Sequence, residues 1–569
     1  MRVFRVHFIW FVCFLLLTLF SVLFTFYSLF SNISTVLSFS MFSTRSLDLR
    51  VIFLFDGVSL SFIRVVLAIS TIIIVYSFNY MSPYSKPYYF LWLTILFVSS
   101  MLLVITIPRL FFAMLGWDGL GLVSFFLIVY YQNQSSIVSG VFTLLINRVG
   151  DRFFLCSLIL MFYSFSDFTY FTAQLGSFHM SLFLILTFMT KRAIYPFSPW
   201  LPIAIAAPTP ISALVHSSTL VTAGLYLIIR YSYVLYSYPM LIKLLFIASI
   251  FTSFYAGLNT IFEVDFKKLI ALSTLRHLGF IGIAFSLGLL YLSFFHLLVH
   301  ALFKSLLFIT IGDIIINLNH SQDSRYLSLG FTYTPFSCYF IIVSLVNLLG
   351  LPSLRGFFSK DLVLETMSYS NVSFMFQFIL YFNVGFTYYY TYKLFYFSFS
   401  SNKLNPYQLF HQVGYLHLLL ISSLGLRTLL FSRWFMSTVF SFIIFYPLVT
   451  RVKCLPLVLN TIFFLYLLLF LSLPSVKSAF VSSYCSSILF LSNLAMTGSS
   501  NFYYKVLFNS VKSTEIGFIN YSLNTQSVKR VSHVSAIIVE SLYNVQSNIM
   551  SSYFLIFIMI AFSVYVYVK

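Results

Sequence analysis

Three polar residues recur at helical spacing within one otherwise apolar stretch, FFHLLVHALFKSLLF. His296, His300 and Lys304 stand four residues apart, so on a helix they share one face over roughly 12 Å. Imidazoles titrate near neutral pH, and a buried lysine changes its protonation state readily. The row therefore predicts a path that hands protons along through intervening water. Haem ligation is an alternative, but an i, i+4 pair fits it poorly, because two axial histidines approach the ring from opposite sides.

Residues 191–230 combine a lysine and a histidine with a burst of prolines in membrane-like sequence. Proline removes a backbone donor and clashes with the preceding turn, so we expect a membrane helix that breaks and restarts here. Such a break survives at membrane depth only inside protein or beside a water-filled cavity. Lys191 and His216 lie beside it and are therefore functional candidates.

A second apolar stretch is interrupted by glycines and a proline between residues 350 and 356, and Lys360 and Asp361 follow directly. Lys191 and Lys360 thus look like corresponding positions in two halves of the chain. Paired interrupted spans in two halves point to ion sites in transporters.

Asp118 lies within the apolar stretch FFAMLGWDGLGLVSFFLIVYY, with no cation near it in sequence. A carboxylate at such a place needs a proton or a partner from another helix. Lys191 is the natural candidate, and a static structural ion pair is the alternative. In the second half, Lys304 would take the place of Asp118. The glycines after Asp118 superficially resemble a dinucleotide fingerprint, which we reject because no strand precedes them.

Composition places these residues in a polytopic membrane protein. The chain has 569 residues, is 60% hydrophobic and 8% charged, and has a mean hydropathy of +0.97, which excludes an ordinary soluble globular protein. Apolar runs of about twenty residues recur without strand alternation, so the spans are helices rather than barrel strands. We expect about fifteen, at residues 8–30, 54–78, 89–107, 110–131, 137–163, 180–195, 211–231, 241–262, 267–289, 291–316, 335–350, 357–399 (long and broken), 411–431, 433–450, 456–473 and 551–568.

The formal charge of +19 and the five cysteines carry less information. Basic residues mostly flank the apolar runs, which indicates loop and interface anchoring rather than nucleic-acid binding. The cysteines are far apart and form no C-x-x-C motif, so we expect no zinc or iron–sulfur site and no disulfide. The N-terminus has a basic start and a long apolar core, which predicts a retained first span. The 72 phenylalanines, with their thymine-rich codons, hint at an organelle genome.

The polarity rises from about residue 477 to residue 550. This segment is amphipathic rather than spanning, and we expect a helix that lies along the membrane surface. A linker outside the membrane is the alternative. The closing apolar run predicts a final span.

Seven motifs in this order resemble the NADH:ubiquinone oxidoreductase chain 5 family, the antiporter-like membrane subunits of respiratory complex I. The core also resembles subunits of multi-subunit sodium/proton antiporters, but the surface helix and final span favour chain 5. The motifs lie at residues 116–124 (GWDGLGLVS), 147–151 (NRVGD), 196–224, 265–274, 296–308, 319–325 and 356–361 (GFFSKD).

The resemblance implies an all-α polytopic fold with two inverted five-helix repeats, each containing a broken helix. It also implies proton transfer through a chain of ionisable residues, with three more in support. The transfer residues are Asp118, Lys191, His216, His296, His300, Lys304 and Lys360, and the supporting residues are Asp151, Lys267 and Asp361.

The same resemblance implies that this chain holds no cofactor or metal, and that NADH, FMN, iron–sulfur clusters and ubiquinone belong to partner subunits. It implies the mitochondrial inner membrane as the location, with membrane lipid around the chain. Partners would be other membrane-arm subunits, especially neighbouring antiporter-like subunits contacted through the surface helix. A sodium/proton antiporter subunit, a haem-bearing electron-transfer protein and a purely structural arm subunit are the alternatives.

We accordingly expect five regions. They are N-terminal transmembrane helices (1–107), an antiporter-like proton-translocating core (108–400), C-terminal transmembrane helices (401–476), an amphipathic lateral-helix segment (477–550) and a C-terminal anchor (551–569).

The sequence departs from the family pattern at four positions within or beside the motifs. Asp118 replaces a glutamate, and Arg192 adds a cation directly after Lys191. Arg276 and His277 stand where the family has a serine and a glutamine.

Overall fold

The computed structural model describes residues 2–31, 34–43, 48–81, 86–163, 177–317, 322–323, 334–350, 356–369, 373–399, 419, 421–428, 458 and 461–466. The expected lateral helix (477–550), the final span (551–568), the span at 433–450 and most of the spans at 411–431 and 456–473 lie outside these residues.

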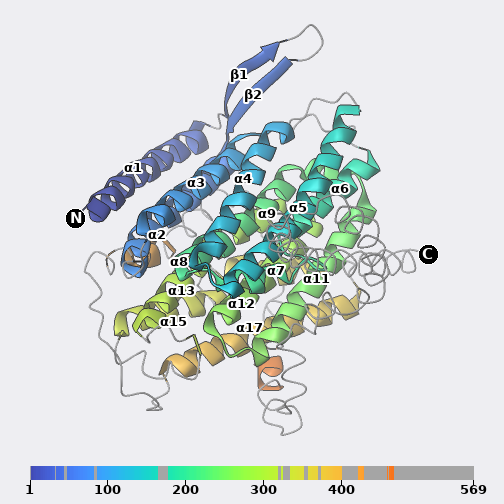
Figure 1. The fold of residues 1–569 in the computed structure, drawn as a ribbon. Coiled ribbons are helices and arrows are strands. Elements are labelled where there is room, and N and C mark those ends of the chain that lie inside the picture. The colour runs from blue at the N-terminus through green and yellow to red at the C-terminus, as the bar shows by residue number, and fades with distance from the viewer. Residues whose placement is uncertain are drawn as a thin grey trace, which may run out of the picture.

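The described chain is a bundle of long helices (Figure 1). Eight of the described helices are long and apolar enough to cross a membrane, and α6 and α15 are shorter apolar helices. Eight of the eleven spans predicted up to residue 350 are therefore confirmed. Helices also occupy the predicted positions 137–163, 180–195 and 335–350, but they are not among these eight, and the total of about fifteen reaches beyond the described residues. The main helices are α1 (Arg2–Ser31), α2 (Gly57–Met81), α3 (Pro87–Thr106), α4 (Leu110–Ile128), α5 (Gln134–Tyr163), α6 (Phe178–Lys191), α9 (Leu220–Arg230), α11 (Pro239–Phe262), α12 (Phe266–Ser286), α13 (Leu290–Asn317), α15 (Pro335–Leu349), α16 (Leu362–Tyr369) and α17 (Phe374–Phe399).

Burial differs sharply between the edge and the centre of the bundle. α1 lies at one edge against α2 and α3, and most of its apolar residues are exposed (Figure 1). α13 is central: its apolar window is wholly buried, and it packs against α2, α9, α12 and α15. The helix that carries the row of two histidines and a lysine is thus enclosed by protein on all sides.

A β-hairpin projects from one end of the bundle (Figure 1). Its strands, β1 (Thr35–Ser43) and β2 (Asp48–Phe55), pair antiparallel. The expectation of an all-helical chain is therefore wrong for this segment. Polar and apolar residues alternate from Leu37 to Ser40, which is a strand pattern. The pattern is short, and the hairpin lies almost entirely in the connection between the expected spans at 8–30 and 54–78, for which no element was predicted.

The first predicted break is confirmed between α6 and α9. α6 ends at Lys191, and the chain continues through α7 (Trp200–Ile203), η3 (Ala204–Ala206), α8 (Thr209–Ile211) and a π-helical turn, η4 (Ser212–His216). The Trp200 indole N–H donates to the Thr190 carbonyl at 2.9 Å. Because the last carbonyls of a helix lack intrahelical partners, this bond stabilises the end of α6 beside Lys191. Two shorter turns, η1 (Val129–Tyr131) and α10 (Ser232–Tyr236), complete this half.

The second break is confirmed after α15. Gly350 caps α15 with a left-handed φ of +78°. The chain resumes as a π-helical turn, η6 (Phe357–Asp361), followed by α16 and, after a further interruption, α17. An added Cβ at Gly356 would collide with the Asn347 carbonyl oxygen, so only glycine fits where the two segments meet. Both breaks therefore contain a π-helical turn that bears an ionisable residue, His216 or Lys360.

An ion pair joins the hairpin to the end of the first broken helix. Both Arg230 guanidinium Nη atoms donate to the Asp56 carboxylate at 2.5 Å. Burial raises the pKa of the Asp56 carboxyl, but Arg230 and the Ser59 hydrogen bonds outweigh burial, so the pKa lies below its usual value of 3.8. This bidentate pair stabilises the end of α9 against the start of α2.

Candidate functional site

The Lys191 cluster consists of Asp118, Asp151 and Lys191 around Trp117. The Lys191 ammonium donates to the Trp117 carbonyl at 3.3 Å and lies 5.0 Å from the centroid of the indole ring. The same indole N–H donates to Asp151 Oδ1 at 3.0 Å. Trp117 therefore connects the buried lysine to a buried carboxylate, which Arg148 also contacts at 3.4 Å.

Asp118 belongs to this cluster but makes no direct ion pair with Lys191: no carboxylate–ammonium contact within 4 Å joins these two described residues. The Lys191 ammonium interacts electrostatically with both carboxylates, more strongly with Asp151 than with Asp118. One Asp118 oxygen, Oδ1, is buried without a hydrogen-bond partner among the described residues. Lys191, the partner that the sequence suggested for Asp118, is thus nearby. The stronger counter-charge of Lys191 is Asp151.

His216 lies between the Lys191 cluster and α13. It is fully buried in η4, and its ring centroid is 6.3 Å from that of Trp200, which binds the carbonyl next to Lys191. η4 itself packs against α13. The histidine that sequence analysis placed beside the first break therefore faces both halves of the core.

The histidine–lysine cluster consists of His296, His300 and Lys304 on α13 together with Ser359 and Lys360 of η6. All five side chains are buried. His296 Nδ1 and Ser359 Oγ lie 2.8 Å apart and share a hydrogen bond, which joins α13 to the second broken helix. The structure thus brings the predicted row of α13 and the predicted lysine of the second break into one site.

Each lysine of this cluster is held by neutral groups. Lys304 Nζ donates to Ser273 Oγ at 2.6 Å. Lys360 Nζ donates to Thr387 Oγ1 at 3.0 Å and to the Leu349 carbonyl at the end of α15 at 3.3 Å. Asp361, buried next to Lys360 in the chain, interacts with it electrostatically. When hydroxyl and carbonyl oxygens bind an ammonium group, loss of its proton does not break a close ion pair. Deprotonation is therefore less costly than it would be beside a carboxylate.

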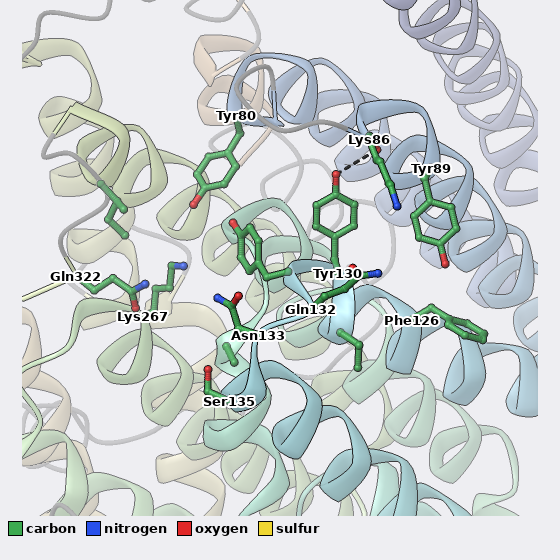
Figure 2. Close-up of a pocket in the computed structure, with 14 residues that line it drawn as sticks. Tyr80, Lys86, Tyr89, Phe126, Tyr130, Gln132, Asn133, Ser135, Lys267 and Gln322 are labelled. Carbon is green, nitrogen blue, oxygen red and sulfur yellow. Dashed lines mark hydrogen bonds between the residues drawn. The ribbon is translucent and has the colours of Figure 1, made fainter. Parts of the chain in front are cut away.

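Lys267, the remaining predicted residue, lies apart from both clusters, at the start of α12. It lines an open pocket of about 980 Å³ that Figure 2 shows, with Gln322 beside it and Lys86 and Tyr130 across the pocket. The Tyr130 hydroxyl donates to the Lys86 carbonyl at 3.1 Å.

A neighbouring pocket of about 840 Å³ shares Ser135 and Gln322 with this one and reaches Leu272. Leu272 precedes Ser273, the residue that accepts the hydrogen bond from Lys304. The two pockets therefore lie against the first two turns of α12, and Ser273 is not among the residues that line them.

Three buried basic residues had no role assigned from the sequence. Arg192 donates to the Leu278 carbonyl on α12, and Gly282 leaves room for its guanidinium, because an added Cβ there would collide with it. The Arg276 guanidinium lies 4.8 Å from the Tyr390 ring centroid. His277 lies between two histidines of α13. Their presence in apolar helices was the available signal, but only the packing of α12 shows what they contact.

Each cluster is built from lysine, histidine or carboxylate side chains, which are acids and bases. The side chains within a cluster can therefore accept and release protons. Within the residues that the structure describes, no group of three or more histidine, cysteine, aspartate or glutamate side chains is arranged to hold a metal ion.

Two family models match the chain. One, described as NADH:quinone oxidoreductase/Mrp antiporter transmembrane region, covers residues 108–387, which include both clusters. The other, described as the N-terminus of NADH-ubiquinone oxidoreductase (complex I) chain 5, covers residues 41–90.

Relatives and solved structures agree with these matches. NADH-ubiquinone oxidoreductase chain 5 of Locusta migratoria is 41% identical over 493 residues, which are 85% of each chain. A chain of the Mrp complex from Dietzia sp. DQ12-45-1b superimposes with a TM-score of 0.67 at 21% identity, over 87% of this chain and 59% of that one. A chain of the membrane-bound sulfane sulfur reductase, an archaeal respiratory membrane complex, gives a TM-score of 0.65 at 19% identity, over 76% of this chain and 90% of that one. The fold is thus antiporter-like, and the chain belongs to the NADH-ubiquinone oxidoreductase chain 5 family.

Proposed function

We propose that this chain is a proton-translocating membrane subunit of NADH:ubiquinone oxidoreductase in the mitochondrial inner membrane. One observation carries the proposal: buried titratable side chains succeed one another from Lys304 along α13 to the Ser359 hydroxyl and Lys360. Ionisable groups are costly at membrane depth and are kept there for transport or proton relay. A static packing role does not account for several of them in sequence along one helix.

The proposed route begins at the pockets beside α12, one of which is lined by Leu272, the residue before the Ser273 that binds Lys304. Protons then pass along the face of α13 to η6. In order, the groups are Lys304, His300, His296, Ser359 and Lys360.

The Lys191 cluster supplies the electrostatic control in this proposal. Lys191 keeps its proton while Asp151 and Asp118 are close, and it releases the proton more readily when a carboxylate moves away. Electron transfer in partner subunits would shift these charges, and the two charge states would differ in their affinity for protons. His216 is placed to pass the proton from Lys191 toward α13.

The remaining parts of the proposal extend beyond the two clusters. Two inverted five-helix repeats account for the paired breaks, each with a π-helical turn that bears an ionisable residue. Residues 477–550 would form the lateral helix that contacts neighbouring antiporter-like subunits, and residues 551–569 the anchor. NADH, FMN, iron–sulfur clusters and ubiquinone would be bound by partner subunits.

Two substitutions test the assigned roles in the assembled complex. Asp118→Asn removes the charge at nearly constant shape, and Lys360→Ala removes the last lysine of the route. We expect each to lower the number of protons translocated per electron, measured as acidification or alkalinisation of sealed vesicles during NADH oxidation. Lys243→Ala, at an exposed position of α11, is the control. Unchanged translocation in both variants would defeat the proposal.

A sodium/proton antiporter subunit remains the second candidate, because the Mrp complex shares this fold. Purification of the chain with a flavin-containing complex favours the proposed function, whereas sodium-dependent proton exchange by a flavin-free assembly favours the antiporter. A haem protein would instead show a Soret band.

A further inference from the structure

His277 enters the histidine–lysine cluster from a different helix. Its ring, on α12, has its centroid 5.7 Å from that of His296 and 5.5 Å from that of His300. The two α13 histidines are one helical turn apart, a rise of about 6 Å. His277 therefore lies against the space between them, and the three imidazoles form a triangle across the α12–α13 contact.

This triangle is the only ring-to-ring connection between the two α13 histidines in the described part of the chain. His296 and His300 each contact His277, but they make no ring contact with one another. The proposed route along α13 alone thus has a gap between His300 and His296, and His277 fills it.

Four ring nitrogens of the triangle have no hydrogen-bond partner among the described residues, whereas His296 Nδ1 is bonded to Ser359. His277 is 2% exposed, and its Nε2 has no hydrogen-bond partner among the described residues. The same is true of His296 Nε2 and of both ring nitrogens of His300. Buried polar atoms normally find partners, so four open nitrogens on three adjoining rings point to exchange rather than packing.

The three imidazoles also share a small cavity. It has a volume of about 10 Å³, and Asn347, Ser359 and Lys360 line it with the histidines. This is close to the space that one water molecule occupies, and a water bridging two imidazole nitrogens would complete a hydrogen-bonded path.

From this geometry we infer that His277 is a further proton-transfer residue, which relays protons between His300 and His296. The inference rests on the proposed function. A proton from His300 forms a new N–H bond on neutral His277, directly or through water, and gives an imidazolium. Breakage of one N–H bond of that imidazolium delivers a proton to His296 and returns His277 to its neutral form. One proton enters and one leaves, so no other reactant is consumed.

The experiment compares two substitutions at this position in the assembled complex. His277→Phe keeps an aromatic ring but removes both nitrogens, and His277→Gln keeps hydrogen-bonding groups but cannot carry a proton. Lys304→Met shows how much proton translocation is lost when the proposed route is blocked. His179→Gln, at an exposed histidine outside both clusters, is the matched control. For each variant, the amount of assembled complex, the rate of NADH oxidation and the protons translocated per electron are measured.

We expect both His277 variants to assemble and to lose most of the translocation that Lys304→Met loses, while His179→Gln matches the unmodified complex. Full translocation by His277→Gln with loss in His277→Phe would mean that the residue only holds water, and it would overturn the inference. Full translocation by both, with loss in Lys304→Met, would also overturn it and leave the proposed function standing. Failure of both variants to assemble would assign His277 to packing. Normal translocation by Lys304→Met would instead defeat the proposed route itself.

Discussion

At the scale of single residues, one aromatic ring supports two buried cations. The Lys304 ammonium lies 5.4 Å and the Arg276 guanidinium 4.8 Å from the centroid of Tyr390. Neither cation forms an ion pair with a carboxylate within the described residues. A desolvated cation–π contact stabilises a cation by about 2 kcal/mol. Tyr390 therefore positions Lys304 without the strong counter-charge that would hold its proton in place.

Two substitutions of Tyr390 distinguish the role of its aromatic face from the role of its hydroxyl. Tyr390→Leu removes the π face, so we expect both lower proton translocation and a loss of stability of about 2 kcal/mol or more. Tyr390→Phe keeps the face and removes only the hydroxyl, which interacts with Arg276, so we expect a clearly smaller effect than that of Tyr390→Leu. Thermal inactivation of the assembled complex and vesicle acidification measure the two effects.

The matched control is Tyr392→Leu, since Tyr392 is 44% exposed on the same helix. Equal effects at Tyr390 and Tyr392, or a Tyr390→Phe variant as impaired as Tyr390→Leu, would contradict the role given to the ring.

At the scale of elements, each helix break is stabilised by a group that binds the carbonyls of the preceding helix end. The Trp200 indole binds the Thr190 carbonyl at the end of α6, and Lys360 binds the Leu349 carbonyl at the end of α15. Free carbonyls at membrane depth are costly, so the interruptions need such partners. Lys360, for which we propose a role in proton transfer, is therefore also part of what holds the second break in place.

A second element-scale contact lies outside the membrane spans and predicts a pH dependence. Asp56→Asn should destabilise the assembled complex by about 2 kcal/mol near neutral pH, because it breaks the bidentate pair with Arg230. The pKa of Asp56 is lower in the folded chain than its usual value, so the pair's contribution is complete above pH about 4 and is lost as the pH falls through the folded pKa.

Thermal inactivation midpoints of the unmodified and Asp56→Asn complexes, measured between neutral and acid pH, check this. Their difference should stay constant down to pH about 4 and then shrink. Asp265→Asn removes the more exposed pair with Lys268, 2.8 Å apart, and should change stability by less than about 1 kcal/mol. A difference that grows on acidification would contradict the assignment.

The sequence predicted the helices and breaks well because their signals are local: apolar runs set the span lengths, and proline or glycine marks the breaks. It also identified Lys191, Lys304 and Lys360 as ionisable residues within membrane-like sequence, since a charge in an apolar run is easily recognised, and all three are buried. The β-hairpin was missed because its alternation is short. The placement of His277 and Arg192 was not predictable, because it depends on which helix faces α12, and no pattern along one helix specifies its neighbour.

At the scale of the whole molecule, α12 and α13 connect the two breaks. η4, with His216, packs against α13 from the first half, and η6, with Lys360, packs against it from the second. Arg192 reaches from the end of α6 to α12, beside the Lys191 cluster. α1 lies at the edge of the bundle (Figure 1), and most of its apolar residues are exposed, whereas the ionisable residues of both clusters lie mostly buried between the helices. The proposed proton route therefore lies within the bundle, away from lipid.

The most direct test of this account is the number of protons translocated per electron by the assembled complex that carries Lys304→Met. In the proposed route, Lys304 is the group that links the pockets beside α12 to the buried histidines, so every proton on that route passes it. We predict a clear fall in this ratio with normal assembly, and no change in Lys243→Met, which alters an exposed lysine of α11. An unchanged ratio in correctly assembled Lys304→Met complex would contradict the account.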